Sequence, residues 1–98
     1  MAGAVCRKVL VSGRVQGVFY RGWTCREAAE LGVSGWVRNL RDGRVEALLC
    51  GPALAVDTLI ARMHEGPGAA RVEAVAVEDV PAGEENDLPR GFVQRPTV

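Results

Sequence analysis

The apolar positions of the chain follow two periods. Residues 5–12 and 71–80 alternate as β-strands do, and apolar side chains on both faces of 5–12 indicate a central strand. Residues 20–31 instead carry an apolar stripe near the 3.6-residue period of a helix, and Gly32 directly after it suits a left-handed C-cap. A second helix is predicted by the i, i+3, i+4, i+7 spacing of Val56, Leu59, Ile60 and Met63.

Turn signals divide the rest of the chain. Asp42-Gly43 lies between predicted strands at 35–40 and 45–50, and this dipeptide favours a hairpin because both residues tolerate positive φ. Gly66-Pro67-Gly68 ends the second helix, and a short last strand at 92–95 is expected at a sheet edge. The order is therefore β-α-β-β-α-β, followed by a short fifth strand.

This order predicts an α+β fold of the ferredoxin-like type. Two helices cannot cover both faces of such a sheet, so we expect a two-layer sandwich with both helices on one face of an antiparallel sheet. The 98 residues are expected to form one domain, 1–98, with a core at about 5–95. The architecture does not decide the function, because enzymes, RNA-binding modules and regulatory modules share it.

Charge is balanced over the whole chain but not along it. There are 12 Lys and Arg residues against 12 Asp and Glu residues. Residues 1–45 carry eight bases and three acids, a net +5, and residues 46–98 carry four bases and nine acids, a net −5. Some of these acids lie in a predicted surface loop at 81–89. The absence of a dense basic run argues against a polybasic tail for nucleic acid or membrane, whereas an anion site in the N-terminal half stays open.

The remaining composition excludes several classes of protein. The longest apolar runs are far shorter than the roughly 20 residues of a membrane span, and no signal peptide is evident, so we expect a cytoplasmic protein without a membrane partner. Three cysteines and one histidine without a Cys-x-x-Cys pair argue against a structural zinc site. We interpret the thiols as small buried apolar side chains, those of Cys6, Cys25 and Cys50.

The segment 12–21 carries the strongest local signal for chemistry. It runs from a predicted strand through a loop with Gly13 and Gly17 into the first turn of a helix, where successive N–H groups can converge on an anion. Arg21 at the mouth of this loop adds a permanently charged fork to the same anion. No Walker A sequence is present. A plain strand-to-helix turn with a solvated Arg21 is the alternative that these residues leave open.

Asn39 stands near the end of the predicted strand at 35–40. Its amide can donate to one oxygen and accept from another, so it can orient a water molecule. The alternative is a turn-flanking Asn that caps its own backbone. His64, near the end of the second helix, fits a partly solvated histidine favoured by the helix dipole, and no Ser-His-Asp or Cys-His set is available.

Together these two segments resemble the acylphosphatase family. Residues 13–21 read Gly-Arg-Val-Gln-Gly-Val-Phe-Tyr-Arg, which is similar to the family signature Gly-x-Val-Gln-Gly-Val-x-Phe-Arg. Residues 35–43 read Gly-Trp-Val-Arg-Asn-Leu-Arg-Asp-Gly, which is similar to the family's Gly-x-Val-x-Asn before an acidic-Gly turn. The resemblance runs from about Lys8 to the end. Tyr20 stands where Phe is usual, and Gln94 stands where many relatives carry an apolar residue, which leaves the register of the last strand open.

The resemblance implies hydrolysis of acyl phosphates to a carboxylate and inorganic phosphate, without metal, cofactor or phosphoenzyme. It implies that Arg21 binds the phosphoryl group and that Asn39 positions the attacking water, so these two are the expected catalytic residues. The loop amides implied to bind the same group are those of Gln16, Gly17, Val18 and Phe19. The expected partner is a small-molecule acyl phosphate, and a chain without a heptad or an obvious apolar patch is expected to be monomeric.

Two other functions stay open beside the enzyme. An RNA-binding module on the same frame would stack bases on aromatic side chains of the central strands. The central strands offer no aromatic residue for this purpose, only Val9, Val11, Ala47 and Leu49. The second alternative is a phosphate-binding or regulatory module without catalysis. For any anion site, the motifs and their flanks predict a basic rim made by Arg14, Arg21, Arg38, Arg41 and Arg44.

Overall fold

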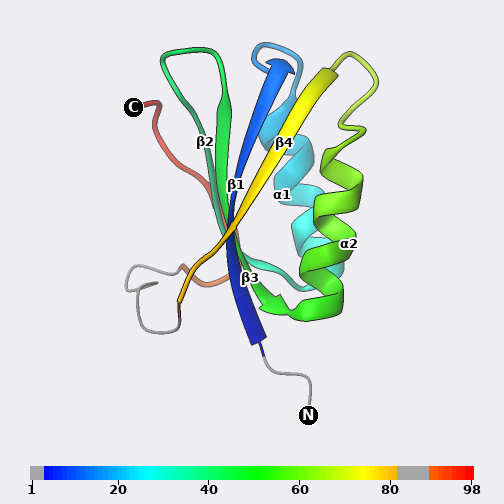
Figure 1. Ribbon diagram of the computed structural model, residues 1–98, viewed down its shortest axis with the longest axis vertical. Coiled ribbons are helices and arrows are strands. Elements are labelled where there is room, and N and C mark those ends of the chain that lie inside the picture. Colours follow the sequence, from blue (N-terminus) through cyan, green and yellow to red (C-terminus); the bar gives the residue numbers. More distant parts are fainter. Residues whose placement is uncertain (1–3, 82–88) are drawn as a thin grey trace.

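A five-stranded sheet carries two helices on one of its faces (Figure 1). The structure is a computed structural model that describes residues 4–81 and 89–98, so the predicted loop at 81–89 lies mostly outside it. The elements are β1 Ala4–Arg14, α1 Tyr20–Leu31, β2 Ser34–Asn39, β3 Val45–Pro52, α2 Ala53–Met63, β4 Arg71–Asp79 and β5 Phe92–Gln94. The predicted βαββαβ order, the short fifth strand and the two-layer arrangement are confirmed.

The direction of β5 differs from the prediction. The strands lie in the order β4-β1-β3-β2-β5, and the first four pair antiparallel. β5 runs parallel to β2, with Gln94 opposite Val37, so the sheet is mixed rather than antiparallel. The reason lies in the topology. β4 ends at the end of the sheet where β2 begins, and a strand that starts there and follows β2 must run in the same direction (Figure 1).

The two faces of the sheet carry different side chains. The face covered by the helices completely buries Val9, Val11, Ala47 and Leu49. An RNA-binding module would stack bases at these positions, but here the side chains pack in the core with the helices and do not face solvent. Because side chains alternate along a strand, the opposite face of β1 and β3 presents other residues. Those include Lys8, Leu10, Glu46 and Leu48, and none of them is aromatic.

Cys6 and Cys50 form a disulfide, which corrects the interpretation of all three cysteines as free buried thiols. The pairing of β1 with β3 places the two residues directly opposite each other, with their Cα atoms 4.1 Å apart. They are separated by 44 positions in the sequence, so only the register of the sheet brings them together. Cys25, on α1, is free and partly buried.

Two predicted turn features are present. Gly32 caps α1 in the left-handed conformation, with φ 74°. In the turn between β2 and β3, Gly43 has φ 100°, and its N–H donates to the carbonyl of Leu40 at 3.1 Å. This turn fixes the point at which β2 ends. Within the described ranges, no helix is long and apolar enough to cross a membrane.

Candidate active site

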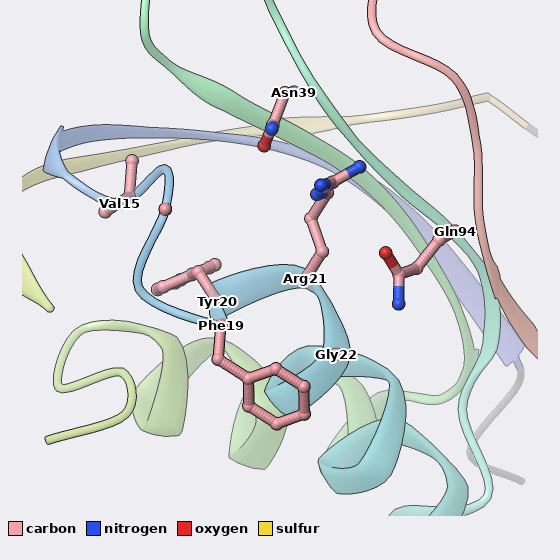
Figure 2. Close-up of a pocket in the computed structure, with 8 residues that line it drawn as sticks. Val15, Phe19, Tyr20, Arg21, Gly22, Asn39 and Gln94 are labelled. Carbon is pink, nitrogen blue, oxygen red and sulfur yellow. The ribbon is translucent and has the colours of Figure 1, made fainter. Parts of the chain in front are cut away.

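A pocket of about 260 Å³ lies where the β1–α1 loop meets the ends of β2 and β5 (Figure 2). Its lining consists of Val15, Gly17, Phe19, Tyr20, Arg21, Gly22, Asn39 and Gln94. Four of the six expected site residues are therefore brought together: Gly17, Phe19, Arg21 and Asn39. The other two, Gln16 and Val18, belong to the same loop but do not line the pocket.

Left-handed backbone conformations shape the β1–α1 loop. Gly17 has φ 72° and Phe19 has φ 65°, and Phe19 is the one non-glycine residue of the described chain with a positive φ. A bulky residue in this region is strained, and such residues cluster at functional sites. Phe19 is also the N-cap of α1, where no side chain caps the helix. The first-turn N–H groups therefore have no capping oxygen, and the positive end of the helix dipole favours an anion there.

The side chain of Gln16 ties this loop to the turn after β2. Its amide nitrogen donates to the carbonyl of Leu40 at 2.7 Å and to the carbonyl of Arg44 at 2.9 Å. The C-terminal segment pins the same region, since the N–H of Val98 donates to the carbonyl of Asn39 at 3.3 Å. The sequence suggested a role for Gln16 through its backbone amide alone. Through its contact with Leu40, the Gln16 side chain joins the two motifs across a separation of 24 residues.

Asn39 is the last residue of β2, and its Oδ1 is buried. This oxygen accepts no hydrogen bond from any residue in the ranges 4–81 and 89–98. A buried acceptor without a partner costs about 1–3 kcal/mol, so it calls for a reason. Capping of the turn does not supply one, because the carboxylate of Asp42 accepts from the N–H of Arg44 at 3.0 Å. The Asn39 oxygen is thus a buried acceptor at the wall of the pocket without a donor among the described residues.

Arg21 projects from the first turn of α1 into the pocket (Figure 2). Among the described residues, no carboxylate pairs with it. Arg38 differs, because its Nη2 lies 2.7 Å from Oε1 of Glu46. Arg44 differs too: its Nη2 lies 2.8 Å from Oδ2 of Asp42, and its hydrogen bonds hold the pKa of that carboxyl below the usual value. The predicted basic rim therefore does not hold for Arg38 and Arg44, whose charges are already compensated.

The hydroxyl of Tyr20 explains one departure from the family signature. The side chain is 1% exposed, and its hydroxyl donates to the carbonyl of Met63 at 2.8 Å, so it links the start of α1 to the end of α2. Burial raises the pKa of Tyr20, and it stays a neutral donor. One helical turn after Arg21, burial raises the pKa of the Cys25 thiol, while the Arg21 charge partly opposes that shift.

No group of three or more His, Cys, Asp and Glu side chains within residues 4–81 and 89–98 could hold a metal ion. The polar groups of the pocket are backbone amides, one guanidinium and two side-chain amides. Such a set suits the binding of a phosphoryl group through hydrogen bonds and charge.

The sequence matches the acylphosphatase family model over residues 7–93. The chain belongs to the acylphosphatase family. A curated acylphosphatase of Nitrobacter hamburgensis is 56% identical over 96 residues, which cover 96% of this chain and 97% of that protein. The class of activity predicted from the motifs, hydrolysis by an acylphosphatase, is thereby confirmed, and a regulatory module without catalysis is not favoured.

Solved acylphosphatases have the same fold as this chain. The structure from Coxiella burnetii is 37% identical, with a TM-score of 0.84, and the match covers 94% of this chain and 93% of that one. The structure from Bacillus subtilis is 31% identical, with a TM-score of 0.85, and the match covers 93% and 98%. The ferredoxin-like acylphosphatase fold is therefore shown for nearly the whole chain.

Four lining residues were not among the expected site residues: Val15, Tyr20, Gly22 and Gln94. Gln94 was noted only as a departure on an edge strand, and it lines the pocket from β5. Its position depends on the parallel pairing of β5 with β2, which joins segments more than 50 residues apart. The one available signal was its polarity at a position where relatives are apolar.

Proposed function

We propose that this pocket hydrolyses the carboxyl-phosphate bond of acyl phosphates, with Arg21 and Asn39 as its catalytic residues. The observation that carries the proposal is that two polar groups without protein partners share one pocket. Arg21 has no carboxylate partner and the Asn39 oxygen has no hydrogen-bond donor among the described residues. A phosphoryl oxygen supplies the missing partner of Arg21, and the attacking water supplies that of Asn39.

The phosphoryl group binds at the start of α1. The N–H groups of the loop from Gln16 to Phe19 donate to its oxygens, and Arg21 adds a charge-assisted fork. The left-handed turns at Gly17 and Phe19 aim successive N–H groups to one side of the backbone, as in other anion-binding nests. The side chain of Gln16 has a separate role, because it holds the turn after Asn39 against this loop.

The chemical step needs little acid or base from the protein. The water held by Asn39 attacks phosphorus, the bond from phosphorus to the acyl oxygen breaks, and its electron pair leaves on the carboxylate. A phosphate oxygen of the substrate takes the proton of the water. Because a carboxylate is a good leaving group and phosphoryl transition states are loose, positioning and charge stabilisation are sufficient for the reaction. The proposal therefore includes no metal, cofactor or phosphoenzyme.

We further propose that the chain works as a monomer in the cytoplasm and forms one domain over residues 1–98. Light scattering on the purified chain measures the first point. Disulfides are rare in reducing compartments, so the redox state of Cys6 and Cys50 in cells tests the proposed location in the cytoplasm. Free thiols trapped at lysis agree with the cytoplasm, and a disulfide argues for an oxidising compartment.

The hydrolysis of benzoyl phosphate in the presence of a chelator tests the proposed function. We expect release of inorganic phosphate by the parent chain at an unchanged rate when chelator is added. A chain that is folded, as judged by circular dichroism, and does not hydrolyse benzoyl, propionyl or acetyl phosphate contradicts the proposal. A rate that collapses with chelator and returns with a divalent cation contradicts its metal-independent part.

A further inference from the structure

One polar side chain lines the pocket but has no part in the proposed chemistry. Gln94 is the last residue of β5, and its amide points toward the space beside Arg21 (Figure 2). The parallel register sets it next to Val37, two positions before Asn39 on the same side of β2. The pocket is therefore built from three separate elements: the β1–α1 loop with the start of α1, the end of β2, and β5.

The amide of Gln94 is available to a bound molecule. Phe92, two residues earlier on the same side of β5, packs against the core, whereas Gln94 is exposed. The amide makes no hydrogen bond to any residue of the described chain. It offers two N–H donors and one acceptor oxygen, and all of them face solvent or a ligand. Because Gln94 is exposed, a polar side chain at this position leaves no buried polar group without a partner. It gives the pocket a second group, besides Arg21, that can bind a ligand.

We propose that Gln94 binds the acyl group of the substrate and selects acyl phosphates with a hydrogen-bonding group close to the carbonyl. This inference rests on the proposed function. The loop amides, Arg21 and the water on Asn39 occupy the phosphoryl side of the reaction. In-line displacement sends the acyl group away from that water, and Gln94 is the polar lining residue left to meet it. The favoured substrates carry a hydroxyl or amide one or two atoms from the carbonyl carbon, rather than an alkyl chain.

Two substrates of the same size separate this role from general binding. Glycoloyl phosphate and propionyl phosphate differ in a hydroxyl that replaces a methyl group beside the carbonyl. The quantity to measure is the ratio of their kcat/KM values, in the parent chain and in Gln94→Leu. Leucine keeps the bulk of the side chain and removes its donors and acceptor. Since one neutral hydrogen bond contributes about 0.5–1.5 kcal/mol, we expect the ratio to fall by about 2- to 10-fold in Gln94→Leu.

A matched control comes from the next residue along the same strand. Val93 is 37% exposed, is not part of the pocket lining, and alternates to the opposite face of the sheet. The exchange Val93→Thr should leave the glycoloyl-to-propionyl ratio at the parent value. Thermal melts of both variants should resemble that of the parent, because an exposed strand position tolerates such exchanges.

The outcomes distinguish the inference from the proposed function beneath it. If the parent hydrolyses both substrates and Gln94→Leu leaves their ratio unchanged, Gln94 does not read the acyl group and the inference is overturned. If Gln94→Leu weakens both substrates and inorganic phosphate equally, Gln94 belongs to the phosphoryl side, which overturns it as well. If the parent hydrolyses neither of these substrates but does hydrolyse benzoyl phosphate, the inference alone is overturned. If it also fails on benzoyl and acetyl phosphate, the proposed function itself fails.

Discussion

Two polar side chains of the pocket differ from the charged side chains on the sheet face away from the helices in whether they have partners within the described chain. On the face away from the helices, Arg38 pairs with Glu46 and its guanidinium carbon lies 4.6 Å from the centre of the Trp36 ring. Arg95 lies 5.3 Å from the same ring, and Lys8 comes within 3.8 Å of Glu46. In the pocket, Arg21 has no carboxylate partner among the described residues, and the Asn39 oxygen has no donor.

The comparison shows that charge in a sequence does not locate a site. Arg21 and Arg38 both lie in the family's motifs, yet only the first is open to a ligand. When an arginine already pairs with a carboxylate and an aromatic ring, its charge is largely compensated. It therefore attracts a further anion only weakly. A polar group left without a partner carries a free-energy cost that a substrate can remove. The compensated group stabilises the fold, and the uncompensated group is ready for binding.

The largest expected effect is that of Asn39→Ala. Loss of the oxygen that we propose to hold the attacking water should lower kcat on benzoyl phosphate by about 10²–10³ or more, by analogy with removal of one group that positions or stabilises the transition state. Because the Oδ1 accepts no hydrogen bond from the described chain, its loss removes no such bond from the fold. Steady-state kinetics and urea titrations measure both effects. A variant that stays folded and retains a rate within a few-fold of the parent contradicts the assigned role.

The exchange Gln16→Met tests whether the two motifs must be tied together. Methionine keeps the length of the side chain and loses both hydrogen bonds to the turn after β2. We expect kcat to fall by up to about 10²-fold through misplacement of Asn39, with a smaller change in the inhibition constant of inorganic phosphate. A rate that stays at the parent value shows that the turn is held well enough without Gln16, and a loss of phosphate affinity as large as the loss of rate places Gln16 on the phosphoryl group.

The disulfide should affect stability and leave the chemistry alone, because it lies between β1 and β3 on the face away from the helices. Replacement of both Cys6 and Cys50 by Ala is expected to lower the free energy of unfolding by about 2–4 kcal/mol. Urea titration measures this loss, and Cys25→Ala serves as the control. We expect kcat within about twofold of the parent for the folded protein, since the pocket residues are unchanged. A large loss of activity in the folded variant shows that the two faces are coupled.

The smallest expected effect is on Cys25. Because burial raises the pKa of its thiol, alkylation at neutral pH should be slower than for a free thiol. The Arg21 charge lowers that pKa, so phosphate bound to Arg21 should raise it again and slow alkylation further. One screened charge contributes about 1 kcal/mol in water at 4 Å, so the factor should not exceed about fivefold. Phosphate should have no such effect in Arg21→Ala, and the same slowing in that variant contradicts phosphate binding at Arg21.

The local features of the fold could be predicted from the sequence. The 3.6-residue period and the terminal glycine gave α1 and its left-handed cap at Gly32, and Asp42-Gly43 gave the turn after β2. Both depend on contacts between residues a few positions apart, which the periodicity records. The expected catalytic pair came from the motifs, and the structure places Arg21 and Asn39 in one pocket.

The features that were missed all depend on strand register or on distant partners. The disulfide follows from the pairing of Cys6 with Cys50, and the place of Gln94 follows from the parallel direction of β5. The hydroxyl of Tyr20 finds its acceptor at the end of α2. The ion pair of Arg38 depends on the register of β2 against β3. None of these follows from spacing along the chain, because each requires the pairing of the strands in the sheet or, for Tyr20, the packing of α1 against α2.

The kinetics of Arg21→Ala beside Arg38→Ala test the central contrast most directly. Arg21 lies in the first motif and Arg38 in the second, so each variant removes one motif arginine. For Arg21→Ala we expect kcat/KM on benzoyl phosphate to fall by about 10²–10³ or more, together with a loss of inhibition by inorganic phosphate. For Arg38→Ala we expect kcat/KM within a few-fold of the parent and a lower free energy of unfolding, because Glu46 loses its close partner. Equal losses of activity in both folded variants, or a larger loss in Arg38→Ala, would contradict the account.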